Sequence, residues 1–156
     1  MVILEAGRED NGIKGFSLVE ILTVLVIIAI LLTIANSMFS AFRQRTNLRE
    51  AAGALAGDMK LAKQRAVAEN VEYTITFDVN NNSYRIQGGT YDVTKKLISF
   101  GTGIKILSQN YGGTMNFQTR GTCDAGMVTL QNSLNSKKIA ITSNITGRVT
   151  IGAVTS

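Results

Sequence analysis

The 156-residue chain contains no histidine, proline or tryptophan, and it has a single cysteine, Cys123. Without histidine the chain lacks the commonest general base and metal ligand, and it contains no CxxC, HExxH, GxSxG or phosphate-loop pattern. A single cysteine excludes an intrachain disulfide, so a folded domain must rely on its core. We predict that Cys123 is a small buried side chain rather than a nucleophile. We expect that the chain is not an enzyme and holds no metal or cofactor.

The composition indicates one modest folded domain with a basic surface. Hydrophobic residues make up 45% of the chain, and the mean hydropathy is +0.14. The formal net charge is +5. A basic balance permits contact with anionic lipid, polysaccharide or nucleic acid, but it does not select among these partners.

An apolar run from Phe16 to Ala35 contains one ionisable side chain, Glu20, and no glycine, lysine or arginine. Its 20 residues are enough to cross a hydrocarbon core of about 30 Å as a helix. A charged, unpaired carboxylate inside such a run costs at least about 2.5–3.5 kcal/mol. Glu20 is therefore either tolerated near the end of a signal anchor or paired with another subunit, and the cost favours pairing.

The residues around this carboxylate carry a resemblance to a known family. Gly15 is followed by Phe-Ser-Leu-Val-Glu at residues 16–20 and then by an aliphatic helix, which resembles the processing site of type IV prepilins and pseudopilins. The resemblance implies that a prepilin peptidase removes the leader, residues 1–15, by cutting after Gly15, and that it methylates the new N-terminus at Phe16. It also implies that Glu20 pairs with the N-terminal ammonium of a neighbouring subunit in a filament.

The spacing of apolar residues over 36–70 predicts an amphipathic continuation of the same helix. A stripe of apolar side chains recurs at steps of three and four: Leu48, Ala52, Leu55, Met59, Ala62 and Ala66. Asp58 is placed with the charged residues that fall mainly off this stripe. A coiled coil with another chain would show the same spacing, but a short, alanine-rich stripe favours packing on the chain's own sheet.

After Asn70 the sequence changes to strand patterns. Apolar and polar residues alternate over 71–79, residues 80–83 predict a turn, and 84–86 predict the returning strand of a hairpin that ends at Gly88 and Gly89. Further strands are expected at residues 97–100, 104–107, 114–118, 127–130, 138–142 and 149–151. Residues 91–96 are expected to form a solvated connection. The predicted fold is α+β and type IV pilin-like, with a long N-terminal helix packed on a mostly antiparallel β-sheet head.

The late chain is similar to the GspH/FimT branch of pseudopilins and minor pilins. In some FimT-like pilins a Gly-Arg-x-Arg motif binds DNA, but here Gly147-Arg148-Val149 is followed by Thr150, so the second arginine is missing. Clustered charge is enough for phosphate binding, and a basic face could be formed by Lys95, Lys96, Arg120, Lys137, Lys138 and Arg148. Arg148, Lys137 and Lys138 are the candidate DNA contacts, although scattered lysines usually mark a solvated surface.

We predict four segments: a leader at 1–15, a transmembrane helix at 16–35, its amphipathic continuation at 36–70 and a periplasmic head at 71–156. The resemblance implies a minor pilin or pseudopilin in the bacterial inner membrane, which joins a type II secretion pseudopilus or a type IV pilus at its tip or during initiation. Its expected partners are the prepilin peptidase, other pilins, the inner-membrane assembly platform and membrane lipid. A DNA-binding minor pilin of natural transformation and a single-pass receptor with an uncleaved anchor remain the alternatives.

Overall fold

The computed structural model describes residues 16–155, with the side chains of residues 34–38 and 41 excepted. The chain divides into two compact units, Met1–Met38 and Phe39–Ser156. One helix, α1 (Leu18–Glu69), contributes to both units. The leader predicted at residues 1–15, including Gly15, lies outside the described residues.

Helix α1 is terminated by a residue in the left-handed conformation. Asn70 has φ 53°, which is a common way for a helix to end. In the second unit the predicted apolar stripe is confirmed, because all six of its residues are buried. The stripe packs on the chain's own strands, as the sequence analysis favoured.

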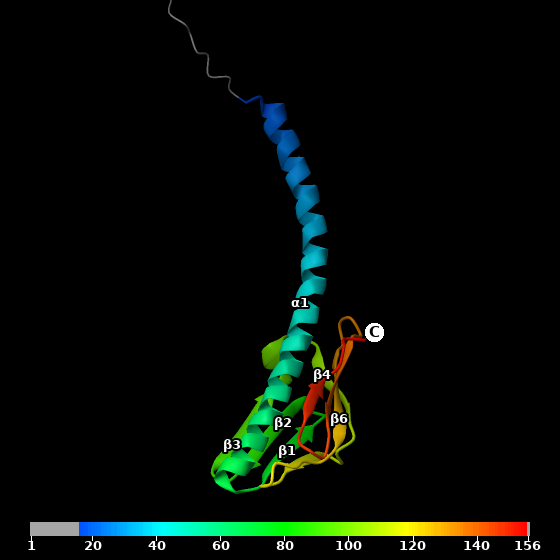
Figure 1. The fold of residues 1–156 in the computed structure, drawn as a ribbon. Helices are drawn as coiled ribbons and strands as arrows, with labels where there is room; N and C mark the ends of the chain where they lie inside the picture. The colour runs from blue at the N-terminus through cyan, green and yellow to red at the C-terminus, as the bar shows by residue number, and fades with distance from the viewer. Residues whose placement is uncertain (1–15, 156) are drawn as a thin grey trace, which may run out of the picture. The chain divides into compact units, whose positions relative to one another are not determined.

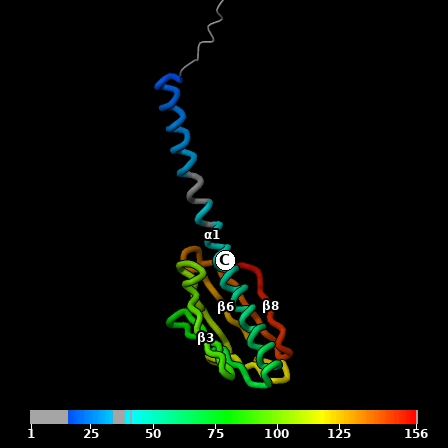
Figure 2. The backbone as a smooth tube through the Cα atoms, turned by 90° about the vertical axis from the view of Figure 1, so that its left-hand side faces the viewer, coloured from blue at the N-terminus to red at the C-terminus, as the bar shows by residue number. Residues whose placement is uncertain are grey.

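The strands form two antiparallel sheets of four (Figure 1). The first sheet has the order β3 (Tyr91–Lys96), β2 (Ser83–Gly88), β1 (Tyr73–Asp78), β5 (Thr114–Phe117). The second has the order β4 (Ile104–Gln109), β6 (Gly126–Asn132), β7 (Lys138–Ser143), β8 (Val149–Ile151). In Figure 2, β3 and β8 lie on opposite sides of the second half of α1. The predicted α+β fold with an antiparallel head is confirmed.

A single hydrophobic core joins α1 to both sheets. Its largest buried side chains include Leu55 and Met59 from α1, Tyr73 and Phe117 from the first sheet, and Leu130 from the second. Each large side chain that is fully buried contributes about 1.5–3 kcal/mol of transfer free energy. The core therefore holds the head together without a disulfide.

Residues 97–100 do not form the predicted strand. They form a 3₁₀ helix, η1 (Leu97–Phe100), in which Leu97 is buried and Ser99 Oγ donates to Lys96 O at 2.8 Å. A serine hydroxyl that bonds to a nearby backbone carbonyl competes with a strand ladder. The segment therefore contributes a buried leucine to the core from a short helical turn and not from a strand.

Residues 91–96 were wrongly predicted to be a solvated connection. They form the edge strand β3, which pairs with β2 from Gly88↔Tyr91 to Ser83↔Lys96. Its side chains are half-buried or exposed in alternation. An edge strand of an antiparallel sheet can keep polar side chains on its solvated face, so this strand carries little apolar signal in the sequence.

Candidate functional site

The first unit presents Phe16 and Glu20 at the start of α1. Glu20 lies in the first helical turn, where its backbone N–H donates to Ser17 O at 3.0 Å. Both side chains are exposed, and with Ile21, Val24 and Leu25 they line a shallow hollow of about 270 Å³. A negative charge is favourable near a helix N-terminus. The hollow therefore places a carboxylate among apolar side chains.

The apolar side chains that follow Glu20 are exposed as well. All the large hydrophobic residues described between Leu18 and Leu32 are at least 44% exposed. The run predicted to cross a membrane continues to Ala35, and the side chains of 34–38 lie outside the described part. In the described part of the chain, no helix is long and apolar enough to cross a membrane.

In the second unit, Arg148 lies in the turn that joins β7 to β8. The side chain of Asn144 organises this turn, because Asn144 Oδ1 accepts the Arg148 backbone N–H at 2.9 Å and the Thr146 hydroxyl at 2.7 Å. Gly147 has φ 72°, and a Cβ there would lie 2.5 Å from Gly121 O. The geometry of a tight turn thus explains the glycine at position 147.

Lys63 of α1 also stabilises this turn. Its ammonium group donates to Thr146 O at 3.0 Å and to Gly147 O at 3.3 Å. This contact was not predicted from the sequence. The two hydrogen bonds link Lys63 to backbone carbonyls that lie 83 and 84 positions later in the chain. Sequence spacing carries no signal over such a separation.

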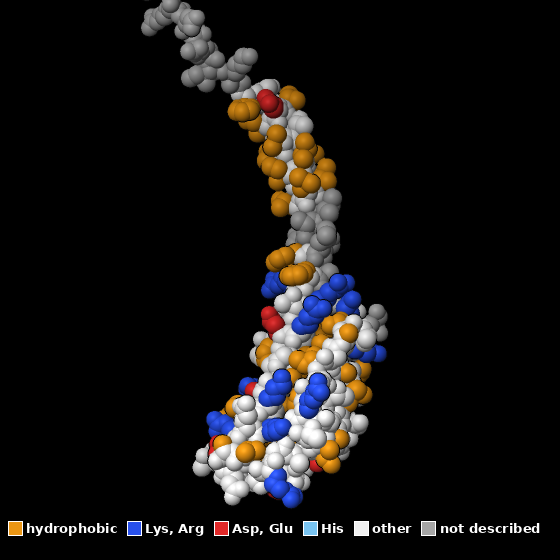
Figure 3. All heavy atoms as spheres, in the orientation of Figure 1, with side chains coloured by type: hydrophobic (Ala, Val, Ile, Leu, Met, Phe, Trp, Pro, Cys, Tyr) orange, Lys and Arg blue, Asp and Glu red, His pale blue; other side chains and the backbone are white. Residues whose placement is uncertain are grey.

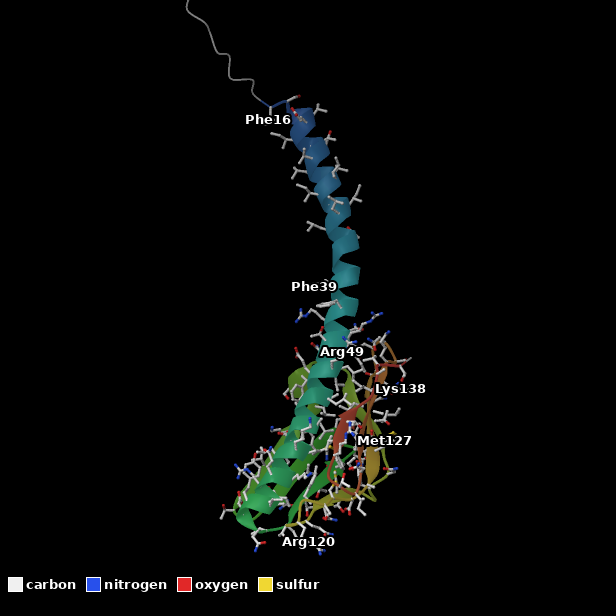
Figure 4. All side chains as sticks on the ribbon, in the orientation of Figure 1. Phe16, Phe39, Arg49, Arg120, Met127 and Lys138 are labelled. Atoms are coloured by element: carbon white, nitrogen blue, oxygen red, sulfur yellow. The ribbon has the colours of Figure 1, made fainter. Side chains whose placement is uncertain are left out.

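The structure does not bring the candidate DNA contacts together. Lys138 begins β7, whereas Arg148 follows the opposite end of that strand, where Ser143 pairs with Val149. The five residue steps between Lys138 and Ser143 correspond to about 17 Å of strand. Figure 4 likewise shows Arg120 at the end of the second unit opposite Lys138. The predicted basic face is divided between two ends of the head.

Lys95 does not contribute a free charge to a basic face. Its ammonium lies 2.8 Å from both carboxylate oxygens of Asp58, and the Tyr84 hydroxyl donates to Asp58 Oδ2 at 2.6 Å. Asp58 and Tyr84 are buried. Burial, together with the hydrogen bond to the carboxylate, raises the pKa of Tyr84 well above its ordinary value, so the hydroxyl remains a donor.

The placement of Asp58 off the helical stripe was wrong. Asp58 follows Leu55 by three residues and precedes Ala62 by four, a spacing that puts it on the buried side of α1. A charged residue at such a position needs a partner of opposite charge, and the partner here is Lys95 of β3. The spacing could have identified Asp58, but the partner depends on the pairing of β2 with β3.

Cys123 is buried, as predicted. Its thiol donates to Asn144 O at 3.2 Å, and burial raises the pKa of the thiol. The protonated thiol is a weak nucleophile. Cys123 is thus a packed side chain beneath the turn that carries Arg148.

We expect the detergent-solubilised protein to bind duplex DNA weakly, with a Kd of about 10⁻⁴–10⁻⁶ M at physiological salt, as is typical of nonspecific contact. Arg148→Ala should weaken binding no more than the matched variant Arg120→Ala does, because neither arginine lies beside Lys137 and Lys138. Fluorescence anisotropy with a labelled duplex measures both. Submicromolar binding that Arg148→Ala alone abolishes would contradict this expectation.

Comparisons with known proteins place these features in a family. Residues 10–36 match a prokaryotic N-terminal methylation motif, and residues 51–147 match the family described as Type II transport protein GspH. The chain belongs to the GspH family. The first match covers Phe16 and Glu20, and the second covers most of the head.

Solved structures show the same fold at low sequence identity. The minor pseudopilin EpsH from the type 2 secretion system of Vibrio cholerae aligns with a TM-score of 0.57 and 10% identity, over 69% of this chain and 97% of EpsH. A second EpsH crystal structure gives 0.53 and 10%, over 71% and 96%. The type IV minor pilin FimU of Pseudomonas aeruginosa gives 0.52 and 14%, over 68% and 93%. No curated protein sequence matches the chain.

The family match and the shared fold confirm the predicted resemblance to minor pseudopilins and minor pilins. They also confirm the prediction that the protein is not an enzyme, because the GspH family consists of structural subunits. The N-terminal methylation motif agrees with a prepilin-type N-terminus.

Proposed function

We propose that this GspH family member is a minor subunit of a type II secretion pseudopilus or a type IV pilus, which assembles through its N-terminal helix at the tip or during initiation. The observation that carries the proposal is the exposure of the large apolar side chains described between Leu18 and Leu32, with Glu20 in the first turn of the helix. Such a surface is stable only when lipid or other apolar helices cover it. In a pilin this helix surface is covered first by membrane lipid and then by the helices of neighbouring subunits in the filament.

Processing is the first step of the proposed route. A prepilin peptidase cuts after Gly15, and the methylated amine of Phe16 becomes the N-terminus. Residues 16–35 then anchor the protein in the bacterial inner membrane, with the head in the periplasm. The match of residues 10–36 to the methylation motif supports this route, and so does the length of the apolar run.

Assembly then brings Glu20 to the N-terminal ammonium of a neighbouring subunit. The hollow beside Glu20 is lined by Phe16 and three aliphatic side chains, so the incoming ammonium would meet a carboxylate in apolar surroundings. Removing one partner of a pair buried in such surroundings leaves the other charge uncompensated. The pair therefore sets the register of the subunits.

Mass spectrometry of the membrane-extracted protein tests the processing step. We expect Phe16, carrying one methyl group, as the first residue. Gly15→Leu should keep the leader attached while the protein still inserts, because the apolar run is unchanged. The matched control is Gly12→Leu, which alters the leader without touching the cut site and should be processed normally. An intact Met1 terminus in cells with an active prepilin peptidase would rule out the pilin route.

A further inference from the structure

One end of the second unit combines cations with exposed apolar side chains. It is formed by the start of this unit's part of α1, residues 39–50, and by the loop between β6 and β7 at residues 132–138. We name this surface the basic end and define it by these residues: Phe39, Phe42, Arg43, Arg45, Arg49, Leu134, Lys137 and Lys138. In Figure 3, Lys and Arg side chains gather at this end, and Figure 4 places Arg49 and Lys138 there together.

Asn132 holds the two segments side by side. Its buried side-chain amide donates to Gln44 O of α1 at 3.3 Å, and its carbonyl oxygen accepts the Leu134 N–H at 2.9 Å. The backbone N–H of Asn132 donates to Lys137 O at 2.9 Å, which closes the loop. The loop that carries the lysines is therefore held against α1 at Gln44, which lies between Arg43 and Arg45 in the sequence.

The charge of this surface is strongly one-sided. Residues 39–50 contain three arginines and one acidic residue, Glu50, and residues 132–138 contain two lysines and no acidic residue. Arg43, Arg45 and Arg49 are exposed, and both lysines are half-buried. An anionic partner fits this surface, because a row of cations attracts anions over about a Debye length.

Apolar side chains among the cations narrow the choice of anion. Phe39 is 60% exposed, Phe42 is 66% exposed and Leu134 is 59% exposed. The guanidinium of Arg43 lies 5.7 Å from the centre of the Phe39 ring. Exposed aromatic and aliphatic side chains next to cations suit a bilayer interface, where apolar groups enter the acyl boundary and cations meet the headgroups. Nucleic acid would satisfy the cations but would leave the leucine and phenylalanines in water.

We propose that the basic end docks on the anionic phospholipid headgroups of the membrane in which residues 16–35 are anchored. This inference rests on the membrane anchor of the proposed function. Phe39 follows the last residue of the apolar run, Ala35, by only four positions, so the start of the surface is tethered close to the membrane boundary. Docking would hold the unassembled head against the bilayer, and entry into a filament would have to release it.

Labelled full-length protein in lipid nanodiscs tests the docking. A bimane fluorophore is attached at Leu134→Cys in a Cys123→Ser background, and the lipids carry a spin-label quencher in their headgroups. The matched control carries the label at Ile145→Cys, because Ile145 is similarly exposed at 69% but lies in the turn beyond the opposite end of β7. The nanodiscs contain phosphatidylcholine alone or with phosphatidylglycerol.

With phosphatidylglycerol we expect quenching at position 134 to exceed quenching at position 145 at least threefold. In roughly 0.5 M salt the quenching at position 134 should fall to its value in phosphatidylcholine alone, because salt screens exposed charges. Lys137→Gln with Lys138→Gln should remove the difference. Arg120→Gln with Arg148→Gln makes the same charge change at the other end and should not. Each variant is compared with its parent by thermal unfolding, so that a loss of fold is seen.

Equal quenching at the two positions, or no dependence on phosphatidylglycerol, would overturn the docking while leaving the anchor intact. Failure of the protein to enter nanodiscs would overturn the anchor and the docking with it. If Lys137→Gln with Lys138→Gln weakened binding to duplex DNA and left the lipid quenching unchanged, the surface would be a nucleic-acid-binding surface. The lipid proposal would then be wrong.

Discussion

Glu20→Ala should lower the recovery of partner pilins with this protein at least tenfold, while insertion of the protein into the membrane improves slightly. The substitution removes a charge that costs at least about 2.5–3.5 kcal/mol in an unpaired state within the bilayer, so the anchor becomes more favourable. It also removes the partner of the neighbour's ammonium, and about 1.4 kcal/mol of lost interaction is enough for a tenfold effect. Insertion and assembly should therefore change in opposite directions.

Affinity purification of the tagged protein from cells, with partner pilins quantified by immunoblotting, measures assembly, and alkaline extraction of membranes measures insertion. Thr23→Ala is the matched control, since the Thr23 hydroxyl donates to Val19 O of its own helix at 2.8 Å. Glu20→Asp keeps the charge and should retain part of the assembly. If Glu20→Ala recovered partners as well as the parent does, the ion-pair role of Glu20 would be wrong.

Asp58→Ala should destabilise the head by about 2–4 kcal/mol, the largest stability change expected for a single charged residue of this protein. The variant leaves the buried Tyr84 hydroxyl without its acceptor, which costs about 1–3 kcal/mol. Loss of Lys95 adds less, because the lysine side chain is 38% exposed and can turn to water. For a domain of this size the melting temperature should fall by about 8–15 °C.

Thermal unfolding followed by circular dichroism measures this change, and the Asp92→Ala variant is the control. Asp92 pairs with Arg85 on the same sheet, but both side chains are nearly half exposed, so the loss should be under about 1 kcal/mol. Asp58→Asn keeps an acceptor for Tyr84 and should fall between the two. Equal losses for Asp58→Ala and Asp92→Ala would show that burial adds nothing to the network.

Two segments of the head form other elements than the sequence predicts, for different physical reasons. The edge strand β3 carries polar side chains, and its pairing with β2 rather than its composition makes it a strand. Segment 97–100 is apolar enough for a strand, but Ser99 bonds to its local backbone and Leu97 fills the core. Pairing with β2 decides the first case. A local hydrogen bond and the burial of one leucine decide the second, and neither effect can be read from the periodicity of the segment.

By itself, the sequence determined the features that depend on near neighbours. The apolar run with one carboxylate, the helical stripe from Leu48 to Ala66 and the alternation of β1 follow from periods of 3.6 and 2 residues, and these periods are set by backbone geometry. Tertiary structure alone decided which charges from distant parts of the sequence meet. Pairing of β2 with β3 delivers Lys95 to Asp58, and the length of β7 separates Arg148 from Lys138. The amide of Asn132 joins the loop between β6 and β7 to α1 at Gln44. Such contacts form only when segments far apart in sequence are packed on one core.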